Sequence, residues 1–175
     1  MKNRKVAYLT CIGGILTSIT VLLQAAPVYL PVVGLALSPF STLPIAIAAI
    51  INPVLGLMVL ISSFLILTFI NLQEALILLF ATGLLGIVLG VLLYRKRASI
   101  AFLFSTIALT KGMLILTYCV AVPGFVDFTA SIGFPLVLMI FHLFSIVYTL
   151  VWIISLKKVV HYTQKVISFF VDLYD

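Results

Sequence analysis

The residue with the clearest chemical potential is Lys111, a cation in the middle of an apolar stretch from Ile100 to Val122. An ammonium at the centre of a membrane helix costs roughly 2.5–3.5 kcal/mol on insertion scales. A partner carboxylate, a polar cavity or an anionic group of a ligand would offset that cost. Lys111 therefore predicts either a polar site inside a helical membrane protein or a contact with a partner subunit.

Further polar side chains fall in the same half of the apolar segments as Lys111, and polar residues inside membranes commonly mark routes for ligands or ions. Tyr118 follows Lys111 by two helical turns and shares its helix face. We predict a ligand site in the outer half of the helix bundle. Its expected lining residues are Lys111, Glu74, Asn71, Gln24, Tyr118 and His142.

Several of these residues also have a structural explanation. Lys111 can form an ion pair with Glu74, and Glu74 begins a helix, where a carboxylate is favoured by the helix dipole. A neutral His142 can hydrogen-bond to a backbone carbonyl. Trp152, near the inner end of its segment, is typical of the aromatic residues found at membrane interfaces.

The composition identifies an integral membrane protein of the all-α class. The chain has 175 residues, of which 65% are hydrophobic and only 8% are charged, whereas soluble domains have about 25% charged residues. Six segments approach the length of about 20 apolar residues that a membrane helix needs. We expect a single transmembrane domain with spans at 6–25, 32–51, 54–70, 74–94, 100–122 and 134–156, followed by a tail at 157–175. Because Pro39 and Pro44 interrupt the second segment, we expect a short helix from Thr42 onward, preceded by a partly buried loop.

The basic residues predict the orientation of these spans. They gather before the first span, after the fourth and after the sixth, and with six spans all three groups fall on one side of the membrane. Cytoplasmic loops are enriched in Lys and Arg, so we expect both termini in the cytoplasm of a multi-pass cell-membrane protein. The net charge of +6 is thus explained by topology, and we expect the lipid bilayer rather than nucleic acid as its partner. The three groups are Lys2, Arg4 and Lys5; Arg95, Lys96 and Arg97; and Lys157, Lys158 and Lys165.

Signatures of catalysis are missing from the sequence. It contains no glycine-rich phosphate loop, no His/Glu spacing typical of zinc sites and no paired carboxylates, so we expect a non-enzyme without metal or cofactor. Cys11 and Cys119 are expected to be small buried residues near opposite membrane faces, too far apart for a disulfide.

Small residues four apart let helices approach closely. The first span contains Gly14 and Ser18, and the fourth contains Gly86 and Gly90. We treat both pairs as possible docking positions for another membrane subunit, although packing within the bundle explains them equally well.

The passage at 43–56, LPIAIAAIINPVLG, combines a Leu-Pro start, a helix of small residues and a Pro-x-x-Gly turn. Together with the size, the six spans and a Pro-rich first outer loop, it resembles the substrate-binding S components of energy-coupling-factor (ECF) vitamin transporters. The resemblance implies a vitamin-like ligand near the outer face, a transmembrane coupling subunit and two cytoplasmic ATPases. The family's docking motif is a pair of alanines four apart in the first span, where this chain has Gly14 and Ser18, or Ala7 and Cys11.

Two functions from different classes remain open. The first is a binding subunit for uptake of a small vitamin-like solute, energised by partner subunits because the chain has no nucleotide-binding motif. The second is a non-transporting scaffold or assembly protein of the rod-shape-determining type, which has a similar size and number of spans.

Overall fold

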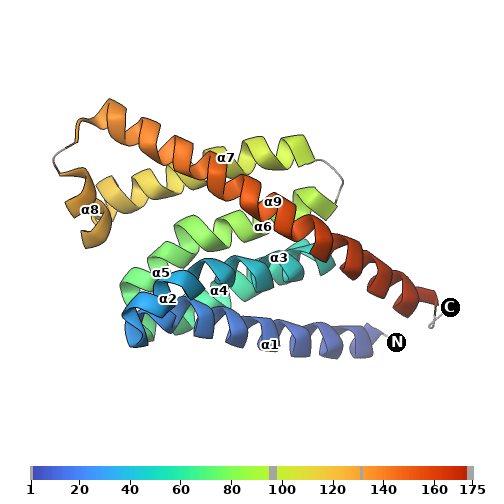
Figure 1. Cartoon of the computed structure of the whole chain (residues 1–175). Helices are drawn as coiled ribbons and strands as arrows, with labels where there is room; N and C mark the ends of the chain where they lie inside the picture. Colours follow the sequence, from blue (N-terminus) through green and yellow to red (C-terminus); the bar gives the residue numbers. More distant parts are fainter. Residues whose placement is uncertain (1, 95–97, 131, 173–175) are drawn as a thin grey trace.

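The computed structural model describes residues 2–94, 98–130 and 132–172, and within these ranges the chain is built of helices, with no strand (Figure 1). Six of the helical segments are long and apolar enough to cross a membrane: Val6–Tyr29, Pro31–Ile51, Pro53–Ile70, Leu72–Leu93, Ala98–Cys119 and Phe134–Lys158. The prediction of an all-α chain with six helical segments of membrane-spanning length is confirmed, with limits that differ from the predicted ones by a few residues. Arg95, Lys96 and Arg97 lie outside the described residues, as do residues 173–175 of the tail.

Several spans consist of more than one helical element. Asn52 and Asn71 separate consecutive helices, and each accepts hydrogen bonds through Oδ1 at a helix start, from Val54 N at 2.8 Å and from Gln73 N at 2.9 Å. In chain order the elements are α1 (Lys2–Tyr29), α2 (Pro31–Leu37), the 3₁₀ turn η1 (Ser38–Ser41), α3 (Thr42–Ile51), α4 (Pro53–Ile70), α5 (Leu72–Ile77), the π-helical η2 (Leu78–Thr82), α6 (Gly83–Tyr94), α7 (Ala98–Leu114), the π-helical η3 (Ile115–Cys119), α8 (Pro123–Thr129) and α9 (Phe134–Asp172).

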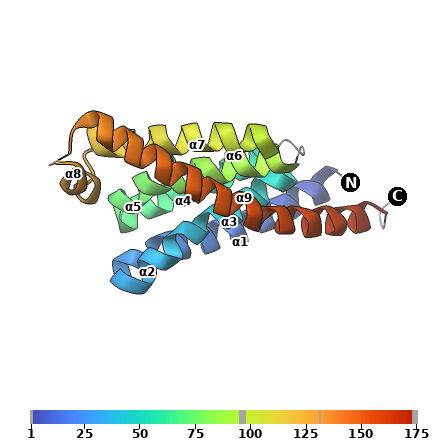
Figure 2. The same cartoon turned by 45° about the horizontal axis from the view of Figure 1, so that its top comes forward.

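The long helices run back and forth between two ends of one bundle. The start of α1 and the end of α9 lie at the same end, and α2, α5 and α8 lie at the other (Figures 1 and 2). α3 occupies the middle and packs against α4 and α6; α6 packs against α7, and α7 against α9. Having both chain ends on one side agrees with an even number of spans.

The second span is broken where its prolines predict. Pro31 begins α2, Pro39 lies in η1, and α3 starts at Thr42 as expected. The segment before Thr42 is a short helix and a 3₁₀ turn rather than a loop. α2 folds back against α1 so closely that a side chain at Gly34 would collide with the backbone of Ala26. This return places η1 inside the bundle, with Ser38 and Ser41 buried.

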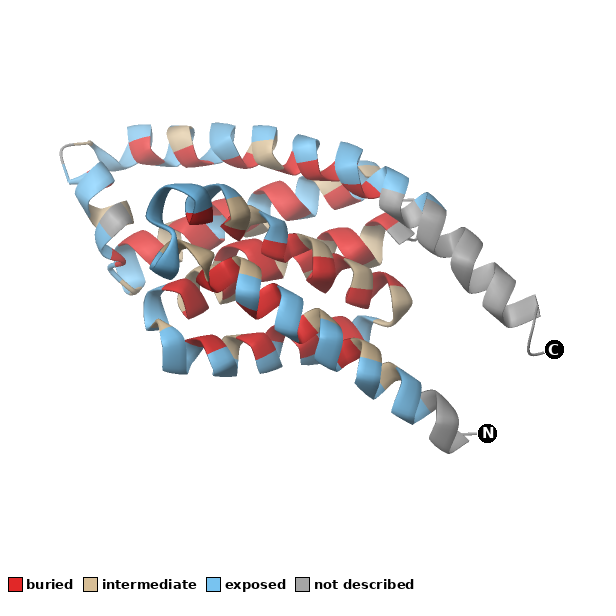
Figure 3. Ribbon diagram, turned by 60° about the horizontal axis from the view of Figure 1, so that its bottom comes forward, coloured by how far each residue is buried: buried red, intermediate tan, exposed pale blue. Residues whose placement is uncertain are grey.

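The buried surface of the bundle follows the inner faces of the helices, and the outward faces of α1, α4 and α9 are exposed (Figure 3). The glycine stripe of α6 is part of this interior, because a Cβ at Gly86 would lie 2.9 Å from Thr42 O and one at Gly90 would lie 2.5 Å from Ala46 O. Gly86 and Gly90 therefore bring α6 against α3 of the same chain, and their prediction as a subunit-docking pair is wrong. Gly14 and Ser18 are exposed on α1 and stay available for docking.

Candidate functional site

Four polar side chains from three spans meet in the interior around Gln24, which is completely buried. Its Nε2 donates a hydrogen bond to Glu74 Oε2 at 2.7 Å. Its Oε1 accepts from Ser41 Oγ at 2.7 Å and from Thr82 Oγ1 at 3.1 Å. We call Gln24, Ser41, Glu74 and Thr82 the polar cluster. Since three neighbours bond both ends of the Gln24 amide, its orientation is fixed by the network.

Three members of the polar cluster lie at an irregularity or an end of their span, whereas Gln24 lies within the continuous helix α1. Ser41 is the last residue of η1, where the prolines break the second span. Thr82 is the last residue of the π-helical η2, and π-helical turns within α-helices occur frequently at functional sites. Glu74 lies in the first turn of α5, where the side chain of Asn71 accepts from its backbone N–H at 3.2 Å. The predicted site residue Asn71 therefore caps α5 and holds Glu74 in place.

One carboxylate oxygen of Glu74 is available to accept a further hydrogen bond. Its Oε2 is bonded to Gln24, and its other carboxylate oxygen has no hydrogen-bond partner among the described residues. The side chain is buried except for a relative exposure of 9%. An amine or hydroxyl group that reaches this oxygen would meet an acceptor already oriented by Gln24.

The other three predicted site residues do not join the polar cluster. Lys111, Tyr118 and His142 are exposed on the outer side of α7, η3 and α9. No ion pair joins Lys111 to Glu74 within the part of the chain that the structure describes. The prediction that these residues share one interior site with Gln24 and Glu74 is wrong, because the two groups belong to different helix faces.

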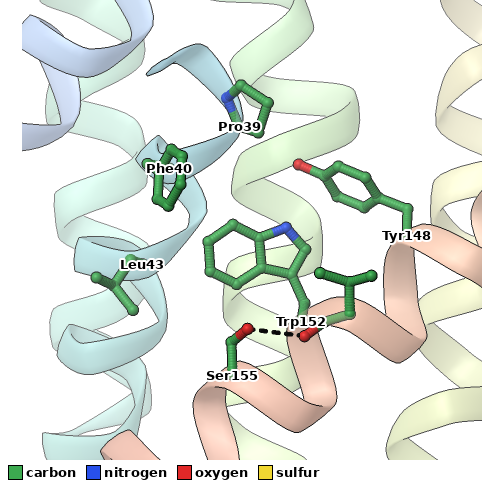
Figure 4. A pocket seen from close by; sticks show the side chains of 7 residues that line it. Pro39, Phe40, Leu43, Tyr148, Trp152 and Ser155 are labelled. Carbon is green, nitrogen blue, oxygen red and sulfur yellow. Dashed lines mark hydrogen bonds between the residues drawn. The ribbon is translucent and has the colours of Figure 1, made fainter. Parts of the chain in front are cut away.

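A pocket of about 400 Å³ lies next to η1 and is lined in part by Pro39 and Phe40. Pro39 and Phe40 of η1 and Leu43 of α3 form one wall, and Tyr148 and Trp152 of α9 form the other (Figure 4). The Phe40 and Trp152 rings meet edge to face with centroids 6.1 Å apart, and the Tyr148 and Trp152 centroids are 6.4 Å apart. The Tyr148 hydroxyl and the Trp152 indole nitrogen turn toward the middle of this space. We call it the aromatic pocket.

η1 links the aromatic pocket to the polar cluster, since Phe40 lines the pocket and its neighbour Ser41 bonds to Gln24. Two buried hydroxyls of the helices that form the pocket walls, Thr42 Oγ1 of α3 and Thr149 Oγ1 of α9, have no hydrogen bond within 3.5 Å among the described residues. The Tyr148 hydroxyl interacts with the side chains of Trp152 and Thr42, at a distance that leaves Thr42 without a short bond. Threonines in helices commonly bond back to the preceding turn. These unpaired hydroxyls leave hydrogen-bonding capacity inside the bundle at α3 and α9.

Sequence analysis did not predict the aromatic pocket. Trp152 was expected at the membrane interface, but it is buried and packs against Phe40 and Tyr148. A signal was present in the four-residue spacing of Phe144, Tyr148 and Trp152, which places three aromatic rings on one helix face. The rings of Phe144 and Tyr148 are stacked at 5.5 Å.

The remaining predicted features concern metals and cysteines. Within the described ranges, no three His, Cys, Asp or Glu side chains gather as a metal site would require. Cys11 and Cys119 are both exposed free thiols, so the prediction that they are buried is wrong. Both lie on helix faces that point out of the bundle, where a small apolar side chain suits a lipid environment.

No family model, no curated protein and no solved structure matches this chain. The function is therefore inferred from the site itself.

Proposed function

We propose that this chain is a membrane-embedded binding subunit for a small, vitamin-like solute that contains a flat ring and hydrogen-bonding groups. The observation that carries the proposal is the aromatic pocket, which shares η1 with the buried polar cluster. Small-molecule sites typically have volumes of about 300–1,000 Å³ and combine apolar or aromatic walls with a few polar groups. The pocket volume of about 400 Å³ falls within that range.

The side chains suggest how such a solute would be held. Phe40, Tyr148 and Trp152 offer ring faces and edges against which a flat ring packs favourably. The Tyr148 hydroxyl and the Trp152 N–H supply hydrogen bonds at the rim of that surface. A movement of η1 would displace both Phe40 and Ser41. Ligand binding at Phe40 would therefore be coupled, through Ser41, to the Gln24–Glu74 hydrogen bond.

Energy for uptake would come from other subunits. The sequence has no phosphate-binding loop, so we propose a transmembrane coupling subunit and two cytoplasmic ATPases, as the resemblance of residues 43–56 to ECF S components implies. Gly14 and Ser18 on the exposed face of α1 would be the contact with the coupling subunit. In this arrangement both termini are cytoplasmic, and the aromatic pocket lies in the inner half of the bundle, because Trp152 is close to the end of the sixth span at Lys158.

The alternative of a membrane scaffold is favoured by a different observation, the exposed cation Lys111 in the middle of a span. A scaffold would use this residue to bind other membrane proteins and would have no ligand. The two proposals are separated by a direct test of ligand binding.

Trp152 makes that test specific, because it is the only tryptophan in the chain and lies in the pocket. The purified full chain is titrated with a panel of water-soluble vitamins while its tryptophan fluorescence and melting temperature are measured. A ligand should change both signals, and Phe40→Ala should weaken its binding about tenfold through the loss of an aromatic wall. Phe69→Ala, at a ring that is 93% exposed on α4, is the matched control and should leave binding unchanged.

Mass spectrometry of the purified protein completes the test. Small molecules and coupling subunits that co-purify with the wild type support the binding subunit. If neither co-purifies and no vitamin alters the fluorescence or the melting temperature, the proposal fails and the scaffold is favoured.

A further inference from the structure

The outer face of α7 carries a cation where a lipid-facing helix would be apolar. Lys111 is exposed and has no hydrogen bond or ion pair with any described residue. Phe104 and Ile107, on the same face of α7, and Tyr118 beyond it in η3 are also exposed. A single charge thus interrupts an apolar surface, and this surface is not covered by the chain's own helices.

The depth of Lys111 prevents it from reaching water easily. It lies eight residues before Cys119, where the span ends, which corresponds to about 12 Å of helix. Helical side chains point toward the N-terminal end of their helix, and for Lys111 that is the more distant end, about 20 Å away at Ala98. A lysine side chain extends only about 6 Å, too short to bring its ammonium to that interface by snorkelling.

His142 lies beside Lys111 at the same depth. It is eight residues from Phe134, where the antiparallel α9 begins at the same end of the bundle. Its Nδ1 is 3.2 Å from Thr110 Oγ1, whose own hydrogen is donated to Thr106 O at 2.8 Å. His142 Nδ1 therefore donates to Thr110, and its exposed Nε2 is left for another partner. Two polar groups of the α7–α9 face consequently need partners from outside the chain.

The chain itself does not offer a suitable carboxylate. It has four acidic residues: Glu74 is in the polar cluster, Asp127 lies in α8 beyond the end of the α7 span, and Asp172 and Asp175 lie at the C-terminal end. A second copy would therefore present no exposed carboxylate at the depth of Lys111. Lipid phosphates lie at the membrane surfaces, outside the reach of this side chain.

We infer that the α7–α9 face, formed by Phe104, Ile107, Lys111, Tyr118, Leu138 and His142, is the docking surface for a transmembrane helix of a different protein that presents a carboxylate at the depth of Lys111. The carboxylate neutralises Lys111. His142 Nε2, which is the acceptor nitrogen when Nδ1 carries the proton, accepts a hydrogen bond from a donor group of the partner helix. The apolar residues around the pair exclude water and surround the partner helix. This surface lies away from the aromatic pocket and does not depend on the proposed ligand.

The inference is tested by photo-crosslinking of the full chain in the cells that naturally produce it. A benzophenone amino acid is placed at Ile107, one turn from Lys111, and as a control at Phe69, which is exposed on α4. We expect a discrete crosslinked product from position 107, absent from position 69, that contains a membrane protein with an Asp or Glu inside a transmembrane segment. Lys111→Met should lower its yield about tenfold, since one partner of a desolvated charge pair is lost, and Lys111→Arg should preserve it.

Exchange of the charges provides the decisive step. Lys111→Glu should abolish the product, and replacing the partner's carboxylate by lysine should restore it. The inference is overturned if position 107 yields only lipid adducts, self-crosslinks or no discrete product, or if the yield is the same in the Lys111→Met chain. The melting temperature of each variant shows that it is folded.

Discussion

The helices α1 to α6 and the helices α7 to α9 satisfy their polar side chains in different ways. In the first group, Gln24, Ser41 and Thr82 bond to one another across three spans. In the second group, buried hydroxyls bond within their own helix: Thr117 Oγ1 donates to Met113 O at 2.8 Å and Ser145 Oγ donates to Phe141 O at 2.7 Å. The titratable groups Lys111 and His142 face outward. A network of side chains thus joins three spans in the first group. In the second group one contact at 3.2 Å, between Thr110 and His142, joins α7 to α9, and Lys111 is left for contacts outside the chain.

The largest effect is expected where the two groups meet. A Cβ at Gly112 of α7 would collide with the carbonyl oxygen of Phe80 in η2, so Gly112→Val should force α7 away from the π-helical turn. We expect a loss of stability of roughly 3 kcal/mol or more. Gly14→Ala is the control, because nothing lies within 4 Å of a Cβ there. It should stabilise by about 0.5–1 kcal/mol through helix propensity. Unfolding of both variants in mixed micelles measures the difference, and equal stabilities would contradict close packing at Gly112.

The polar cluster is tested by Gln24→Leu. The change leaves the buried groups of Glu74, Ser41 and Thr82 without their shared partner, at a cost of about 1–3 kcal/mol. Gln73→Leu makes the same chemical change at an exposed position on α5 and should stay within about 0.5 kcal/mol of the wild type. If both variants unfold at the same denaturant concentration, the network does not contribute to stability.

The separation of the two groups predicts that Lys111 and Glu74 are energetically independent. Lys111→Met removes an unpaired cation and should leave the stability of the isolated chain unchanged or slightly higher. Glu74→Gln should have its own effect through Gln24, and the double variant should equal the sum of the single ones within about 0.5 kcal/mol. A coupling above about 1 kcal/mol in this double-mutant cycle would show that the two residues interact in the membrane.

A small effect on stability is expected at Ala121, just beyond the end of η3. Ala121 has a φ of 57°, the left-handed conformation that glycine adopts without a steric cost. Ala121→Gly should therefore raise the stability by about 0.5–1 kcal/mol. Ala130→Gly is the matched control, because Ala130 ends α8 with a φ of −56°. Its expected effect is a loss of a few tenths of a kcal/mol, and a gain at both positions would point to another cause.

The number of spans and the break before Thr42 were predictable because they depend on local properties. Apolar length, the positions of Pro39 and Pro44 and the Asn-Pro pair at Asn52 each act on the residues next to them. The start of α3 at Thr42 follows directly from these restrictions.

The direction of individual side chains was less predictable, because it depends on how each helix is rotated within the bundle. The helices are apolar on nearly all sides, so their sequence patterns give no inward face. Lys111 was therefore predicted to lie inside the bundle, because an ammonium at the centre of a membrane helix costs free energy unless a polar site offsets it. Gln24 and Glu74 were correctly expected near each other. The α-helical period also fails beyond the π-helical η2 and η3, where the extra residue per turn changes the register.

The length of α9 has a mechanical consequence. It is a continuous helix of 39 residues, about 58 Å long, and so about twice as long as the apolar core of a membrane is thick. Trp152 and Asp172 are separated by about 30 Å of this rod. A tilt of about 10° about Trp152 would displace the far end of the helix by about 5 Å, so a small change at the pocket wall would become a larger displacement at Asp172.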